Sequence, residues 1–139
     1  MQITQVPNKL IVEWCEDVKA VKDRWLSFFI SLEEFSQAVM ITGVEYARAH
    51  RAVAWIADAS EAKGVFPQEI QDFISQQVFK AFTDIGIKYF ISVQPKSAVS
   101  KLGVKRYESE LGPHGIQLVE VASVEGAFAF LREQVKIAG

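Results

Sequence analysis

The sequence predicts a single α/β domain built on a mixed, mostly parallel sheet. Three observations carry this prediction. The segment Ala52–Ala57 is apolar throughout and stops at Asp58, which is typical of a strand covered on both faces. Residues 67–85 then repeat apolar side chains at three- and four-residue spacing, as an amphipathic helix does. A second apolar run, Ile87–Val93, follows Gly86, so the helix joins two parallel strands in a βαβ unit.

Two further strands are expected before this unit. The first is Leu10–Cys15, and the second lies within Val18–Phe29. Alternation breaks at Val21–Lys22, which suggests a β-bulge. The stretch Trp25–Ile30 is rich in β-prone residues and should belong to the second strand. A turn at Glu16–Asp17 would set the first strand antiparallel to the others.

The remaining elements complete an order of strand-strand-helix followed by repeated strand-helix. Ser31 and Glu34 have capping-box spacing and should begin a helix that runs to Ala49 or His50. A short helix is expected within Ala98–Leu111. Ile116–Val121 should be an edge strand, and Ser123 should cap a final helix. The prediction is five strands and about four helices in one domain spanning residues 1–139.

Composition excludes several classes of protein. The net charge is -2 and no basic stripe is visible, which argues against nucleic acid as a partner. No apolar run approaches the ~20 residues that span a bilayer, and no leader peptide is visible. Cys15 is the only cysteine, so no internal disulfide can form, as expected in a reducing compartment. We therefore expect a cytoplasmic protein without an integral membrane segment.

Several segments carry a resemblance to a known family. They are Trp55–Ser60 with an acidic strand end, Pro67-Gln68-Glu69 opening a helix, Asp84–Val93, and Gly115–Leu118 followed by Ser123–Phe128. In this order they resemble the SpoIIAA-like branch of the STAS superfamily, the fold of anti-sigma-factor antagonists. The resemblance covers roughly Leu10 to Leu131.

The resemblance implies a small cytoplasmic module that binds a partner and is not an enzyme. Antagonist members carry a phosphorylatable serine where the helix after the third strand begins. Here that place reads Val65-Phe66-Pro67-Gln68, and Asp58-Ala59-Ser60 matches only the preceding strand end. The branch is also similar to lipid-carrying folds, which implies an apolar ligand or a membrane surface as the alternative partner.

Asp58 and Ser60 are the first candidate site residues. They follow a central parallel strand at its carboxyl end, where open α/β sheets usually bind ligands. Their carboxylate and hydroxyl can hydrogen-bond a ligand or a partner's backbone. The alternative, which we favour, is a local turn in which Asp58 accepts hydrogen bonds from its own backbone.

A basic cluster and an apolar excess supply the other candidates. Lys101 and Lys105 share a helical face if their segment is continuous, and with their neighbours they could receive a phosphate or an anionic head group. A solvated helix face is the simpler reading. Apolar residues also exceed what the inward stripes require, and we read this first as a homodimer contact, because symmetric dimers are the commonest oligomers. A protein partner, an apolar ligand, or a helix Leu32–Ala49 that is buried on two sides are the other readings. The basic cluster is Lys96, Lys101, Lys105 and Arg106, and the excess includes Phe28, Phe29, Ile30, Met40, Ile41, Val44, Phe66 and Phe79.

No cofactor or metal site is readable in the sequence. His50 and His114 are the only histidines, and neither stands at metal-ligand spacing with Cys15. Phosphate-binding loops and nucleophile elbows are also missing. We therefore expect a non-enzymatic binding module that has no catalytic residue and acts through protein–protein contact. The alternatives are a carrier or sensor of an apolar or amphipathic ligand and, last, a small enzyme that uses Asp58.

Overall fold

A six-stranded mixed sheet forms the centre of the protein. The computed structural model describes residues 1–93 and 114–138, with side chains described to residue 134. The strands lie side by side in chain order. The first, second and third pair antiparallel, and the third to the sixth pair parallel, so the third strand belongs to both groups. They are β1 (Gln2–Val6), β2 (Leu10–Cys15), β3 (Ala20–Trp25), β4 (Ala54–Asp58), β5 (Tyr89–Val93) and β6 (Gln117–Val121).

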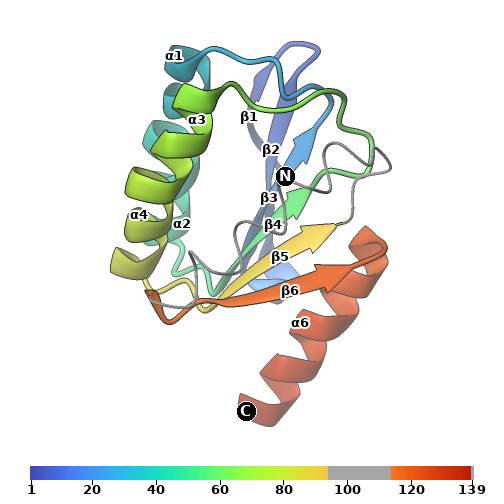
Figure 1. Cartoon of the computed structure of the whole chain (residues 1–139). Coiled ribbons are helices and arrows are strands. Elements are labelled where there is room, and N and C mark those ends of the chain that lie inside the picture. The colour runs from blue at the N-terminus through green and yellow to red at the C-terminus, as the bar shows by residue number, and fades with distance from the viewer. Residues whose placement is uncertain (94–113, 139) are drawn as a thin grey trace.

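Three continuous helices pack on this sheet within the described ranges. The first joins α1 (Leu32–Phe35), η2 (Ser36–Val44) and α2 (Glu45–Ala49), and the second joins α3 (Gln68–Phe73), η3 (Ile74–Val78) and α4 (Phe79–Asp84). The third is α6 (Val124–Ala138). Figure 1 shows the first two side by side on one face of the sheet and α6 on the other. The α/β class and the mixed sheet are thus confirmed.

The strand count and one strand boundary differ from the sequence prediction. β1 was not predicted, because it is an edge strand of mixed polarity that is held by its backbone pairing to β2. The second predicted strand ends at Trp25, and residues 26–30 form a loop. The ladder between β2 and β3 runs in unbroken register, and the register shift lies instead between β1 and β2. The helix expected within Ala98–Leu111 lies outside the described residues.

Local signals placed the helix ends well. Ser31 Oγ accepts the Glu34 N–H, and the Glu34 side chain accepts the Ser31 N–H, so the capping box is formed. Gly86 follows α4 with a φ of 89°, the left-handed conformation expected after a helix. Ser123 Oγ accepts the Gly126 N–H at the start of α6. These contacts depend on residues three positions apart, which a sequence displays directly.

Both helices on the first face contain a wide π-helical segment, η2 and η3. A wide turn advances the following side chains around the helix axis, so a 3.6-residue pattern loses its phase. This explains Phe79, which falls off the predicted apolar stripe yet is completely buried. The close approach of η2 to the sheet also needs Gly43, because a Cβ there would lie 2.8 Å from Trp55 Cη2.

Each face of the sheet has its own apolar core. The larger core lies under the first two helices and includes Trp25, Trp55 and Phe90. The smaller lies under α6 and includes Ile56 and Ile91. Because side chains alternate along a strand, Trp55 and Ala57 of β4 face the larger core. Ala54, Ile56 and Asp58 face α6. This assignment decides which side of the sheet each candidate site residue occupies.

Candidate functional site

Two loops at the carboxyl ends of β3 and β4 form the candidate site. We call residues 26–31 and 59–66 the loop pair. Their backbones are joined, since the Phe28 N–H donates to Lys63 O at 2.9 Å and the Lys63 N–H donates to Leu26 O at 3.3 Å. Ser27 and Lys63 also form an isolated parallel bridge. The loops therefore extend the parallel pairing of β3 and β4 beyond the strands.

The loop pair presents large apolar side chains to solvent. Phe29 is 62% exposed and Val65 is 39% exposed. The Phe29 ring lies over Gly64, where a Cβ would clash with the ring and where φ is +80°. Gly64 is thus needed both for its backbone conformation and for the space that its missing side chain leaves. The result is an exposed aromatic ring that rests on a defined backbone surface.

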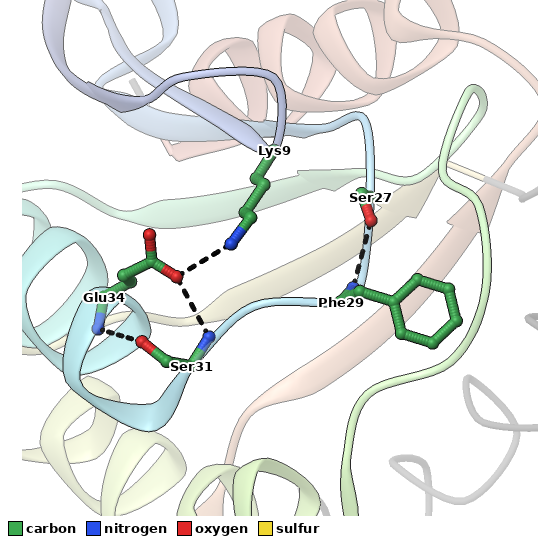
Figure 2. Close-up of polar contacts among 5 residues, drawn as sticks. All are labelled: Lys9, Ser27, Phe29, Ser31 and Glu34. Atoms are coloured by element: carbon green, nitrogen blue, oxygen red, sulfur yellow. Dashed lines mark hydrogen bonds and ion pairs between the residues drawn. The ribbon is translucent and has the colours of Figure 1, made fainter.

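Polar contacts fix the backbone on either side of Phe29. Its own N–H donates to Ser27 Oγ at 3.1 Å. Beyond it, Glu34 Oε1 accepts both the Ser31 N–H at 3.1 Å and Lys9 Nζ at 2.9 Å. Figure 2 shows these contacts, with the Phe29 ring turned away from Ser31 and Glu34 toward the loop that follows β4. The hydrogen bonds hold the loop and leave the ring to make contacts elsewhere.

Aromatic side chains of the loop pair pack with others from β3 and the first two helices in a single cluster. Trp25 stacks on Phe35 at a centroid distance of 5.8 Å and meets Phe66 edge-on at 4.9 Å. Phe28 contacts both Trp25 and Phe66. Phe73 of α3 adds an edge contact to Phe35. Phe66, a member of the predicted apolar excess, is therefore half-buried in this cluster.

Asp58 and Ser60 form a local turn at the same end of the sheet. Asp58 is 6% exposed, and its Oδ1 accepts the Ser60 N–H at 3.1 Å and the Ser60 hydroxyl at 2.7 Å. This is the local turn of the alternative reading. Asp58 faces α6, whereas the aromatic cluster lies on the opposite face. The aromatic cluster of the loop pair and the Asp58 side chain therefore lie on opposite faces of the sheet.

Most of the apolar excess lies in the core. Phe28, Ile30, Val44 and Phe79 are buried, and Met40 packs half-buried against them. Ile41 remains 56% exposed on η2. The basic cluster of Lys96, Lys101, Lys105 and Arg106 lies outside the described residues.

Sequence reasoning missed Asp23, the buried carboxyl group closest to the aromatic cluster. Asp23 lies between Val21 and Trp25 on the core-facing side of β3 and is 4% exposed. Its Oδ2 accepts the Trp55 Nε1–H at 2.8 Å, and within residues 1–93 and 114–138 its Oδ1 has no hydrogen bond of good geometry. Burial raises the pKa of Asp23 to about 7, against the lowering effect of the Trp55 and Trp25 indoles. The signal available in the sequence was one acidic residue at a position of the alternating strand pattern whose other residues, Val21 and Trp25, are apolar.

Cys15 has no feature of a reactive thiol. Burial raises its pKa, although Lys22 opposes this effect. A raised pKa keeps the less nucleophilic protonated form. Within residues 1–93 and 114–138, no three metal-ligating side chains come together.

Comparison with known proteins assigns no family. No family model, no curated protein and no solved structure matches this chain. Across the part of the chain that the structure describes, no helix combines the length and apolar character needed to cross a membrane.

Proposed function

We propose that the protein is a non-enzymatic binding module of STAS-like type that contacts a partner protein through the loop pair. The observation that carries this proposal is Phe29, a large apolar side chain that is 62% exposed on a loop with a hydrogen-bonded backbone. Protein interfaces concentrate their binding energy in a few aromatic anchors surrounded by weaker contacts. A ring that is already positioned loses less conformational entropy when it enters a partner's pocket.

The surroundings of Phe29 match the rim of such an anchor. Val65 adds apolar surface on the loop pair, and Glu61, another loop-pair residue, forms an ion pair with Arg24 at 2.9 Å. Lys63 is exposed on the same loop pair. An apolar centre with polar groups around it is the usual composition of a protein-binding surface.

The STAS-like part of the proposal rests on the order of elements. β4 ends at the acidic Asp58, a helix from Gln68 leads through Gly86 into the parallel β5, and β6 precedes α6. This is the order on which the sequence resemblance depends. The cytoplasmic location remains part of the same proposal.

Two alternatives have less support. A carrier of an apolar ligand was suggested by apolar residues that prove to be mostly buried. An open groove beside β1, lined by Thr4–Pro7, Glu34, Gln37 and Ala38, holds about 260 Å³, which is below the roughly 300–1,000 Å³ of typical small-molecule sites. An enzyme based on Asp58 would need that carboxyl group free, whereas it holds the Ser60 turn.

Substitution of Phe29 tests the proposal against a matched control. The tagged wild-type protein, Phe29→Ser and Ile41→Ser are used to capture partners from extracts of the source cells. Ile41 is also an exposed apolar residue, at 56%, but it lies on η2 away from the loop pair. We expect one specific protein to be retained by the wild type and by Ile41→Ser, with at least about tenfold weaker retention by Phe29→Ser.

The remaining outcomes are equally informative. Retention that is equal for all three proteins would refute the role of Phe29. Native mass spectrometry of the purified protein identifies a second copy as the partner if a dimer forms and Phe29→Ser abolishes it. Sedimentation with anionic vesicles that depends on Phe29, in the absence of any protein partner, would replace the proposal by membrane binding.

A further inference from the structure

β1 is an edge strand without the usual protection against further pairing. It forms one border of the sheet and β6 forms the other (Figure 1), and among the described strands β1 pairs only with β2. Edge strands normally carry charged residues or proline, which discourage another strand from adding to them. β6 carries Glu120, whereas Gln2–Val6 contains neither a charged residue nor a proline. The outer edge of β1 is therefore a suitable template for one more strand.

The helix beside β1 also lacks charge along its middle part. η2 contacts β1 and β2, and none of its nine residues is charged, although 23% of the whole chain is. Gln37 lines the open groove of about 260 Å³ that separates β1 from this helix. Ile41 follows one turn later on the same side of the helix and is 56% exposed. A groove and an apolar side chain thus accompany the open edge of β1.

These features favour a second copy of the same chain as the source of the added strand. Symmetric dimers form about a two-fold axis, which brings residues near the axis close to their own counterparts. A charge near the axis would therefore face the same charge, and neither β1 nor η2 contains one. If β1 pairs antiparallel with itself about Thr4, two threonines meet at the axis, and this is a favourable cross-strand pair.

The spacing of strands and helices fits this arrangement. Neighbouring strands lie about 4.8 Å apart, so an axis between two copies of β1 lies about 2.4 Å beyond that strand. Because η2 contacts both β1 and β2, its own axis lies about the same distance on the inner side of β1. The two copies of η2 are then about 10 Å apart, which is a packing distance of helices, and each Ile41 is covered. We propose that two copies of the chain join their β1 strands into one sheet and pack their η2 helices across the axis. This contact is separate from Phe29 and does not depend on the function proposed for the loop pair.

Sedimentation equilibrium of the purified protein measures the dissociation constant of this dimer. We expect the wild type to be dimeric at micromolar concentrations. Ile41→Glu places two like charges beside the axis, and Gln5→Lys places a charge on the edge of β1. Each should raise the dissociation constant at least about tenfold. Both residues are exposed in the single chain, so neither change disturbs the core.

Two matched variants locate the contact, and circular dichroism verifies that every variant is folded. Gln117→Lys makes the same change on β6, the opposite edge strand, and Phe29→Glu adds a charge to the loop pair; both should dimerise as the wild type does. A wild type that stays monomeric up to ~100 µM, or a dimer that Ile41→Glu and Gln5→Lys leave undiminished, would overturn the proposal. A dimer that is lost in Phe29→Glu and kept in Ile41→Glu would overturn it too, and would assign the contact to the loop pair.

Discussion

The buried carboxyl group of Asp23 should make the stability of the protein depend on pH in an unusual direction. Burial raises its pKa from 3.8 to about 7, so in the folded state it keeps its proton to near neutrality. In the unfolded chain it ionises at its ordinary pKa near 4. Between these two values the folded state binds more protons than the unfolded state. The free energy of unfolding therefore falls as pH rises from about 4 to about 7, and this contribution levels off above pH 7.

The size of the effect follows from the difference between the two pKa values. Each pKa unit corresponds to about 1.4 kcal/mol, so a rise from 3.8 to about 7 makes the ionised Asp23 cost the folded state about 4 kcal/mol at pH 8. Asp23→Asn removes the ionisation and keeps nearly the same shape. We expect its free energy of unfolding, relative to the wild type, to increase by about 4 kcal/mol between pH 4 and pH 8.

Urea denaturation at pH 4 to 8.5, followed by tryptophan fluorescence and circular dichroism, measures this difference. The difference between the two proteins isolates Asp23, because all other groups titrate in both. Asp17→Asn serves as a control: the hydrogen bond from Arg132 lowers the pKa of Asp17, so its contribution is lost only as pH falls below its ordinary value near 4, and this variant should differ from the wild type by a nearly constant amount between about pH 5 and pH 8.5. If the wild type and Asp23→Asn show parallel stability curves across this range, Asp23 is not the buried acid described above.

Two further predictions concern local geometry. Gly43→Ala should destabilise the protein by about 1–3 kcal/mol in urea denaturation, because its Cβ would lie 2.8 Å from Trp55 Cη2 and the ring is held in the core; an unchanged midpoint would show that the helix can move outward freely. Ser31→Ala should cost about 1 kcal/mol, because the Glu34 N–H loses its acceptor; Ser31→Asp, which keeps an acceptor, should restore most of the loss, and failure to do so would argue against the cap.

Local signals predicted the parts of the fold that neighbours in sequence determine. The capping residue Ser31, the glycine after α4 and the apolar runs of β4 and β5 all act within a few residues, and each was found where the sequence placed it. β1 escaped prediction because its stability comes from pairing with β2. Phe79 was misplaced because the wide turn of η3 changes the helical phase, and no residue pattern marks such a turn.

The candidate site was less predictable, because tertiary contacts define it. Asp58 and Ser60 stand at the carboxyl end of β4 as expected, but their hydrogen bonds are used within the turn. Phe29 and Phe66 look alike in the sequence, and only the packing of the loop pair exposes one and half-buries the other. Asp23 was recognisable as an acidic residue, but its burial away from water depends on aromatic rings that include Trp55 of another strand.

The division of the sheet into an antiparallel and a parallel half has a consequence for how the chain acquires its structure. β1, β2 and β3 are joined by short connections and contact one another within the first 25 residues. β4 and β5 can join only after a whole helix has crossed the sheet each time, which requires closing much longer loops. We expect the three-stranded meander to form early and to serve as the template on which the parallel strands assemble in succession. In pulsed hydrogen exchange during refolding, amides of β2 should then gain protection before those of β5.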